Sequence, residues 1–332
     1  MTLRVGIIGL GCMGNCHMGA YEKVKGARVV AVCDIDEKKR QGDIGVFGKR
    51  DLSGLRIYDK AKEILADPAI DVIDVCLPTH LHAELSCAAL AVGKHVICEK
   101  PMARTSDECK KMVQAAKRSG KQLFLAHCIR FWPHYAKARE IVLSGEYGAV
   151  RSARFFRVGS KPTWSWNNWL HTAKCSGLAA LDLHIHDVDF VQYLFGKPKA
   201  VRSTGMSVSP GGYDHIVTTY DYGKDKLVMA EGAWEYAPGF PFGMTFSIMM
   251  ERASLDLDKT LTLTLYPEKG KSRAVRVPKG DGYTHELQHF VNCLAKGQGS
   301  DIVTPESALQ SVQLVEAEIE SAKSGKPVAV RY

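Results

Sequence analysis

The sequence Val5-Gly6-Ile7-Ile8-Gly9-Leu10-Gly11-Cys12-Met13-Gly14 joins a short apolar run to a GxGxxG motif. When such a motif links a strand to a helix, Gly9 permits the tight turn, Gly11 lets the backbone approach a pyrophosphate, and Gly14 lets the helix pack closely on the strand. The start of that helix then offers N–H groups and the positive end of its dipole to the phosphates. The stretch therefore predicts a dinucleotide-binding loop. The alternative is a glycine-rich turn without a ligand.

An acidic residue ends the second expected strand, Val30-Ala31-Val32-Cys33-Asp34. Asp34 lies 25 residues after Gly9, close to the spacing of roughly 20 residues for an acid that hydrogen-bonds the adenosine ribose. Its charge repels a 2′-phosphate, and the next residue is Ile35 where an arginine would hold that phosphate. The pattern favours NAD over NADP, although the basic stretch 38–40 keeps NADP open.

Short apolar runs alternate with helical stretches through the first part of the chain. Strands that are apolar on both faces and separated by helices are typical of a parallel sheet covered by helices. This alternation predicts a doubly wound α/β domain of the Rossmann type at residues 1–127. The expected strands are 4–8, 28–33, 72–77, 95–98 and 122–126, and the expected helices are 14–25, 37–47, 60–66, 81–92 and 107–119.

The pattern changes after about residue 147. Residues 148–159 and 198–278 contain successive strand-like runs, broken by Gly, Pro, Asp and Lys turns. Consecutive strands with short connections indicate an antiparallel sheet. We therefore predict an α+β domain at residues 128–332 with a large, mainly antiparallel open sheet. Its expected helices are 177–195, 283–296 and 305–324.

Composition excludes several classes of protein. The 332 residues carry a formal net charge of +8 without a long block of like charges, so no nucleic-acid or lipid partner is expected. Ten irregularly spaced cysteines without a CxxC pair indicate reduced thiols and a cytoplasmic location. The chain shows no signal peptide and no apolar run of the ~18 residues that a membrane span needs.

The triplet Glu99-Lys100-Pro101 ends one of the buried strands. Ligands of doubly wound sheets bind at this edge, the carboxyl ends of the strands. Lys100 there can hold a substrate hydroxyl and stabilise negative charge as the proton leaves. The alternative is an ordinary surface lysine.

A second polar group falls within the expected helix 177–195. Asp182, His186 and Asp189 share one face by the i, i+4, i+7 rule, beside an apolar face. A histidine flanked by carboxylates suits a general base near neutral pH. A metal site and inert helix polarity are the alternatives. The absence of HExxH, and the i, i+2 spacing of His184 and His186, disfavour a metal.

Two further segments carry side chains suited to ligands. Trp164-Ser165-Trp166-Asn167-Asn168-Trp169 holds three tryptophans, whose flat faces stack on sugar rings or pack in cores and interfaces. Arg130 is a candidate for contact with cofactor or substrate, and the alternative is a salt bridge within the protein.

In order and spacing, these segments resemble the Gfo/Idh/MocA family of oxidoreductases along essentially the whole chain. The matching segments are Gly9 to Gly14 with His17, Pro78 to Ala83, Gly93 to Pro101, Arg130 to Pro133, Asp182 to Asp189, and Tyr283, Glu286 and Pro305 to Leu309. The resemblance implies an NAD-dependent dehydrogenase acting on a sugar, glycoside or cyclitol. It also implies pairing of subunits into a homodimer or homotetramer.

The resemblance implies catalytic roles for Lys100, Asp182 and His186. His186 would remove the hydroxyl proton, while Lys100 and Asp182 bind and polarise the alcohol. Departures from the family pattern at residues 175–178 and at His184 leave the particular sugar open. No metal ligand is expected. The expected cofactor residues are Gly9, Gly11, Cys12, Met13, Gly14, Asp34, Ile35, Leu77, Pro78, Thr79, His82, Glu99, Lys100 and Arg130. The expected substrate residues are Lys100, Trp169, Asp182, His186 and Tyr283.

Other functions remain open at this point. One is a redox-neutral sugar-processing enzyme that recycles tightly bound NAD through a 3-keto intermediate. Another is a sensor that binds a dinucleotide without chemistry, and a third is a Rossmann protein with an unrelated ligand. The presence of Lys100, Asp182 and His186 together argues against the sensor.

Overall fold

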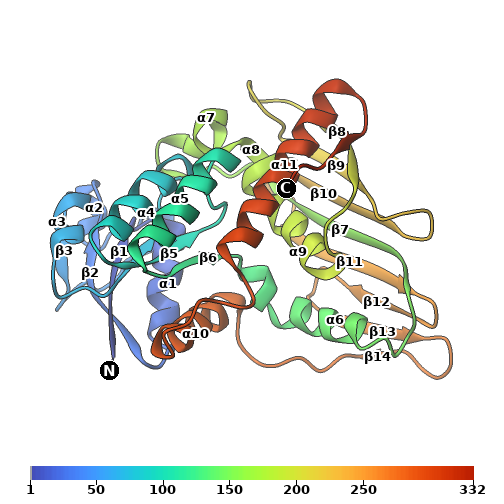
Figure 1. Ribbon diagram of the computed structural model, residues 1–332, viewed down its shortest axis with the longest axis horizontal. Coiled ribbons are helices and arrows are strands. Elements are labelled where there is room, and N and C mark those ends of the chain that lie inside the picture. The colour runs from blue at the N-terminus through green and yellow to red at the C-terminus, as the bar shows by residue number, and fades with distance from the viewer. Residues whose placement is uncertain (1) are drawn as a thin grey trace. The chain divides into compact units, whose positions relative to one another are not determined.

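A computed structural model describes residues 2–332 (Figure 1). The chain forms two compact units, each built from separate segments. The first unit contains the described part of Met1–Cys128, with Trp164–Trp169 and Asp281–Leu309. The second unit contains Ile129–Thr163, Leu170–Gly280 and Gln310–Tyr332. The division into domains 1–127 and 128–332 remains a proposal.

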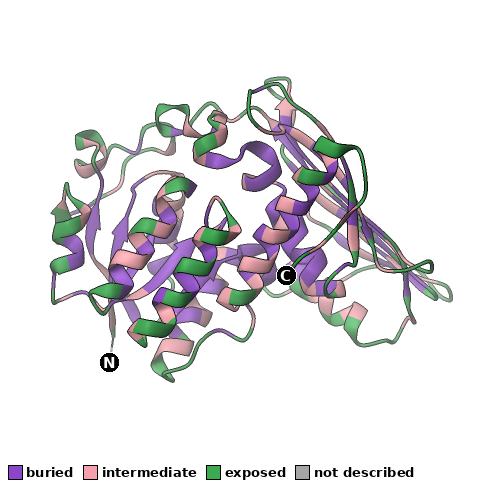
Figure 2. Ribbon diagram, turned by 45° about the horizontal axis from the view of Figure 1, so that its top comes forward, coloured by how far each residue is buried: buried purple, intermediate pink, exposed green. Residues whose placement is uncertain are grey.

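The first unit contains a six-stranded parallel sheet in the order β3-β2-β1-β4-β5-β6. The strand order reverses between β1 and β4, which is where a doubly wound sheet binds its ligand. Apart from the edge strand β3, its strands are buried over most of their length (Figure 2). The strands are β1 (Leu3–Ile8), β2 (Ala27–Cys33), β3 (Arg56–Tyr58), β4 (Val72–Val75), β5 (His95–Glu99) and β6 (Leu123–Ala126).

Helices complete the crossovers of this parallel sheet. They are α1 (Cys12–Tyr21), α2 (Glu37–Arg40), α3 (Ala61–Ala66), α4 (His82–Ala91) and α5 (Ser106–Ser119), with 3₁₀ turns at Gly45–Phe47 and Thr79–Leu81. The prediction of one helix over 37–47 is wrong, because α2 ends at Arg40. Strand β3 was not predicted. Helix α10 (Gly282–Ala295) also belongs to this unit, where Phe290 stacks on Phe124 with ring centroids 4.9 Å apart.

The second unit contains a nine-stranded sheet in the order β14-β13-β12-β11-β7-β10-β9-β8-β15. Strands β7 and β10 pair in parallel and the other neighbours pair antiparallel, so the predicted, mainly antiparallel sheet is confirmed. The strands are β7 (Val150–Ser160), β8 (Ala200–Met206), β9 (His215–Asp221), β10 (Leu227–Tyr236), β11 (Gly243–Met250), β12 (Ala253–Leu257), β13 (Leu263–Pro267), β14 (Arg273–Ala274) and β15 (Val328–Ala329).

Among the remaining helices α11 is the longest, and the others are shorter. They are α6 (Pro133–Leu143), α7 (Ala173–Ser176), α8 (Leu178–Asp182), α9 (Ile185–Phe195) and α11 (Pro305–Ser324), with 3₁₀ turns at Cys128–Phe131 and Trp166–His171. The predicted single helix 177–195 is therefore wrong, because it divides into α8 and α9. His184, at the break, is fully buried and its Nε2 lies 3.2 Å from Glu318 Oε2. A β-carbon on Gly232 would crowd the His184 ring, so only a glycine on β10 leaves room for it.

No helix among residues 2–332 combines the length and the apolar character needed to cross a membrane.

Candidate active site

The GxGxxG loop joins β1 to α1 as predicted. Gly9 has φ +98°, a conformation that glycine adopts without strain, and its N–H donates to the Cys33 carbonyl at 2.8 Å. A β-carbon on Gly14 would overlap the Gly9 carbonyl oxygen, so helix and loop touch through backbone alone. A β-carbon on Gly11 would meet nothing within 4 Å. Among the described residues no side chain caps the start of α1, which leaves its N–H groups to an anion.

Changing Gly14 to alanine should therefore disrupt the loop. The new methyl group meets a backbone oxygen that cannot rotate away, and we expect a loss of about 1–3 kcal/mol of stability together with loss of NAD binding. Thermal unfolding and an NAD titration measure the two effects. Gly11→Ala is the matched control for stability and should keep the native melting temperature, because the space around that position is open. A Gly14→Ala protein with unchanged melting temperature and NAD affinity would contradict this account.

Asp34 lies just beyond β2 and is 8% exposed. Its carboxylate accepts the Leu10 N–H at 2.7 Å and the Asp36 N–H at 2.9 Å, so it holds the glycine loop as well as its own turn. Lys39 Nζ lies 3.6 Å from the same carboxylate. This is where the ribose-binding acid was predicted.

The basic stretch 38–40 has a structural role in addition to its charge. Arg40 donates to the Asp34 carbonyl at 2.9 Å and to the Ile35 carbonyl at 2.8 Å. Ile35 itself is 69% exposed beside them. Lys39 and Arg40 therefore support the end of β2, and this contact favours the NAD interpretation over a ready site for a 2′-phosphate.

Two cysteines lie one turn apart on α1, the helix that follows the loop. A hydrogen bond between them raises the pKa of Cys12 and lowers the pKa of Cys16 to about 7. Both side chains are half-buried. Cys16 is therefore partly thiolate near neutral pH.

The loops after β4 and β5 are joined by one side chain. His82, the first residue of α4, is 1% exposed, and its ring nitrogens lie 2.8 Å from the carbonyl oxygens of Leu77 and Pro101. Burial lowers the pKa of His82, and the two carbonyls oppose that shift. His82 thus positions the loop that contains Pro78 and Thr79. Its predicted contact with the cofactor remains a prediction.

Glu99 ends β5 and precedes Lys100, which is followed by a cis peptide bond to Pro101. Glu99 is 4% exposed. One carboxylate oxygen accepts the Lys100 backbone N–H at 2.9 Å, and the other lies 3.1 Å from His17 Nε2. The sequence placed Glu99 and Lys100 at this sheet edge, and the structure confirms that position.

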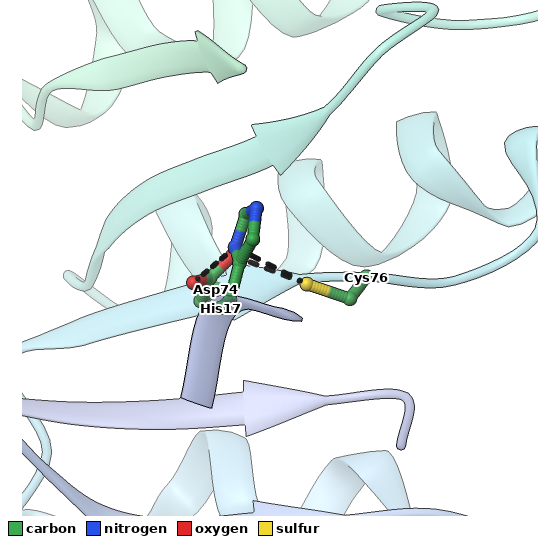
Figure 3. A group of neighbouring side chains, drawn as sticks. All are labelled: His17, Asp74 and Cys76. Carbon is green, nitrogen blue, oxygen red and sulfur yellow. Dashed lines mark hydrogen bonds and ion pairs between the residues drawn. The ribbon is translucent and has the colours of Figure 1, made fainter. Parts of the chain in front are cut away.

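A buried polar cluster contains His17, Asp74 and Cys76 (Figure 3), and His17 connects it to Glu99. His17 Nδ1 lies 2.9 Å from Asp74 Oδ2 and 3.5 Å from Cys76 Sγ, and the Tyr21 hydroxyl donates to Asp74 at 3.1 Å. Sequence reasoning gave these residues no role. A histidine inside α1 and an aspartate inside an otherwise apolar strand were the signals that could have found them. His17, Asp74 and Cys76 are also spaced as metal donors, and the prediction of no metal ligand stays a prediction.

Helix α10 adds Tyr283 and Glu286 to the same unit. The Tyr283 ring lies 6.5 Å from the His17 ring, between centroids. Glu286 is fully buried, and neither of its carboxyl oxygens has a hydrogen-bond partner among residues 2–332. Burial, and then the charge of Glu99, raise the pKa of Glu286 well above its ordinary value. Tyr283 as a substrate contact remains a prediction.

Glu286→Gln should change how stability depends on pH. Because the raised pKa lets the folded chain hold this proton more tightly than the unfolded chain, its contribution to stability is lost as pH rises above about 4.5. Glutamine does not titrate. We expect the melting temperature of the native protein to fall relative to the variant between about pH 5 and pH 8, by roughly 2–4 °C per kcal/mol. The control Glu320→Gln, at an exposed position, should show the native dependence of melting temperature on pH. If Glu286→Gln also shows the native dependence, the raised pKa of Glu286 is contradicted.

The predicted base and its partner lie in the second unit, on either side of the helix break. Asp182 is the last residue of α8 and His186 is the second residue of α9, and both are half-buried. The predicted polar stripe is only partly correct, because Asp189 is buried and its carboxylate accepts Arg130 at 2.7 and 2.8 Å and Ser311 at 2.7 Å.

Two buried ion pairs fix α9 directly after His186. Asp189 pairs with Arg130, and Asp187 pairs with Arg157 at 2.7 Å, with both members of each pair nearly inaccessible. Breaking such a pair costs about 3–5 kcal/mol, because it leaves a charge buried alone. Position 186 is therefore held rigidly while its own side chain stays half-buried.

Arg130 and Trp169 were also predicted as site residues. The Arg130 guanidinium is 5% exposed and engaged by Asp189, so the salt-bridge alternative is observed and contact with a cofactor stays a prediction. Trp169 is half-buried in the first unit. Its neighbours Trp164 and Trp166 are 46% and 41% exposed, and Trp164 packs edge-on against Phe47. Stacking on a sugar remains a prediction for Trp169.

Comparison with known proteins identifies domains of the same family in both halves of the chain. Residues 3–127 match the Gfo/Idh/MocA oxidoreductase family with an NAD-binding Rossmann fold, and residues 139–330 match the C-terminal alpha/beta domain of the same family. An inositol 2-dehydrogenase of Saccharopolyspora erythraea is 27% identical over 343 residues, covering 99% of this chain and 96% of the relative.

Levoglucosan dehydrogenases are also similar. That of Pseudarthrobacter phenanthrenivorans is 32% identical over 233 residues, which cover 65% of this chain and 59% of the relative. A levoglucosan dehydrogenase solved in complex with NADH and levoglucosan superimposes with a TM-score of 0.87 at 25% identity, covering 100% of both chains.

Proposed function

Since the chain belongs to the Gfo/Idh/MocA oxidoreductase family, we propose that it oxidises a secondary alcohol of a sugar, glycoside or cyclitol with NAD. One observation carries the proposal: the family matches both halves of the chain, which contains the predicted catalytic residues Lys100, Asp182 and His186. The similar inositol and levoglucosan dehydrogenases support this substrate class.

The first unit fits NAD. The uncapped start of α1, the open space over Gly11 and the buried carboxylate of Asp34 suit a pyrophosphate and a ribose diol. The loops at Leu77 to Thr79 and at Glu99 to Lys100 follow β4 and β5, the strands beyond the reversal of strand order. When bound, NAD supplies a hydride acceptor, C4 of its nicotinamide ring.

In the proposed reaction, His186, Lys100 and Asp182 have separate roles. His186 takes the proton from the reacting hydroxyl as general base, while the carbon gives up its hydride and becomes a ketone. Lys100 donates a hydrogen bond to the same oxygen and stabilises the negative charge that develops as its proton leaves. Asp182 accepts a hydrogen bond from the substrate and orients it beside His186.

The test is NADH formation, followed by its near-ultraviolet absorbance, across free hexoses, methyl and aryl glucosides, inositols and UDP-sugars. We expect turnover with one of these classes and its loss in His186→Ala. If no compound in the panel yields NADH, but NAD is bound tightly and a sugar product forms without net NADH, the protein would instead be the redox-neutral enzyme. NAD binding without any product would identify the sensor.

We also propose that the chain pairs through its large sheet. Helices α8 and α9 contact one face of that sheet. On the other face Leu227, Met249 and Tyr266 are 59%, 48% and 49% exposed, a cluster that a second subunit would cover. Sedimentation should show a homodimer or homotetramer that Leu227→Asp shifts toward monomer. A monomer at micromolar concentration would contradict the proposal.

For location, we propose the cytoplasm. None of the ten cysteines in residues 2–332 is in a disulfide, and persistent thiols are typical of a reducing compartment.

A further inference from the structure

We propose that His17 is a positioning residue for the reaction: from the dinucleotide-binding helix α1 it fixes the Glu99 carboxylate and, through it, the main chain at Lys100. The inference deepens the proposed function and rests on it. His17 itself is fully buried and is assigned no contact with the substrate.

A continuous chain of hydrogen bonds carries this inference. His17 Nδ1 lies 2.9 Å from the Asp74 carboxylate of β4, and His17 Nε2 lies 3.1 Å from the Glu99 carboxylate of β5. The second Glu99 oxygen then accepts the Lys100 N–H at 2.9 Å. The His17 ring thus connects α1, the helix after the glycine loop, to β4 and β5. The ends of these two strands are predicted to contact the nicotinamide ring. Tyr21 closes the far end by donating to Asp74 at 3.1 Å.

The protonation state of His17 follows from its partners. A carboxylate only accepts hydrogen bonds, so a ring between two carboxylates carries hydrogen on both nitrogens. Burial is the largest single effect and lowers its pKa, but the charges and hydrogen bonds of Asp74 and Cys76 together outweigh burial and raise the pKa of His17 well above its ordinary value. Burial likewise opposes ionisation of Glu99, yet the hydrogen bond and charge of His17 lower the pKa of Glu99. The imidazolium therefore keeps Glu99 ionised beside Lys100.

Other groups face Glu99 from the surrounding elements. Lys100 and His82 further lower the pKa of Glu99, whereas burial and the charge of Glu99 raise the pKa of Glu286. The titratable neighbours are Lys100, His82 of α4, Asp74 and Cys76 at β4, Cys98 of β5, Cys12, Cys16 and His17 of α1, and Tyr283 and Glu286 of α10. Lys100, His82 and His17 are the cationic or protonatable bases among them, and the ring of His17 hydrogen-bonds the Glu99 side chain.

The variant His17→Asn tests the proposal. Asparagine still reaches Asp74 but is too short for Glu99 and carries no charge. We expect kcat to fall about tenfold to a hundredfold, the range expected for a misplaced catalytic group, with the dissociation constant of NAD within about twofold. Protonation of Glu99 should add to that of His186 and move the acid limb of the kcat profile to higher pH, because Glu99 takes up a proton more readily without the imidazolium.

Tyr21→Phe is the matched control. It removes the Tyr21 hydrogen bond to Asp74 and leaves His17 in contact with Glu99, so kcat and the acid limb should stay at their native values. Equal losses in the two variants would show a general disturbance of the core and overturn the proposal, as would a native pH profile in His17→Asn. If His17→Asn does not fold, Glu99→Gln replaces it, and a native acid limb in that variant would also overturn the proposal.

A measurement without turnover separates this inference from the proposed function. Nitrogen-15 NMR of labelled histidine, with His17 assigned by comparison with a variant, should show both ring nitrogens protonated at about pH 8, well above the ordinary pKa of histidine. A neutral ring there overturns the inference whether or not a substrate is found. Stoichiometric zinc in the purified protein would overturn it as well, since a metal on His17 would replace the proton on Nδ1. A protonated His17 in a protein that never forms NADH would refute the proposed function alone.

Discussion

Replacing His186 with alanine should lower kcat by about 10²–10⁴-fold, the usual contribution of a general base, and leave NAD binding unchanged. The loss follows because no other group is proposed to take the hydroxyl proton. His186 lies in α9, which the pairs Asp187–Arg157 and Asp189–Arg130 hold in place, so the substitution should not displace the helix. Steady-state rates and an NAD titration on the same preparations measure both quantities.

The control is His80→Ala, an exposed histidine in the first unit. It should retain native kcat and native NAD affinity. A fall in activity of less than about threefold in His186→Ala would remove His186 from the role of base. If Asp182→Asn then abolished activity with the melting temperature unchanged, the base would be sought at Asp182.

Changing Asp34 to serine should shift the cofactor preference from NAD toward NADP. The carboxylate accepts the N–H groups of Leu10 and Asp36, and we predict that it also accepts ribose hydroxyls. Hydrogen bonds to a charged group are worth about 1.5–3 kcal/mol each, so kcat/KM with NAD should fall about tenfold or more. The change also frees Lys39, now 3.6 Å from Asp34, to meet a 2′-phosphate.

The ratio of kcat/KM for NAD to kcat/KM for NADP is the quantity to compare. Asp36→Asn serves as the control, since it removes a neighbouring charge while an amide oxygen can still cap α2 by accepting the Lys38 N–H. That variant should keep the native ratio. If Asp34→Ser keeps the native ratio too, Asp34 supports the loop but does not select the cofactor.

Local patterns in the sequence predicted the first unit well. The strand before Gly9, the turn at Gly9 and the acid at Asp34 are specified by neighbours in the chain, and the structure places them as expected. Strand β3 was missed because three residues carry too little periodicity to distinguish a strand from a loop.

Long-range pairing explains what the sequence did not reveal. The break between α8 and α9 depends on His184 meeting Glu318 of α11 and the bare backbone of Gly232, neither of which is close in sequence. The same holds for the cluster of His17, Asp74 and Glu99, which joins one helix to two strands. Periodicity assigns a residue to a face but does not identify the side chain it meets.

Gly11 and Gly14 of the loop exclude a side chain for different reasons, and that difference predicts which substitutions each position tolerates. Gly14 is fixed by the protein's own backbone, whereas the space beside Gly11 is open until a ligand fills it. In a saturation library sorted first for protease resistance and then for turnover, substitutions at position 14 should disappear in the first sort. Those at position 11 should survive it and disappear only in the second. A descendant of this chain that no longer needs its dinucleotide would therefore keep the last glycine of the motif and lose the middle one.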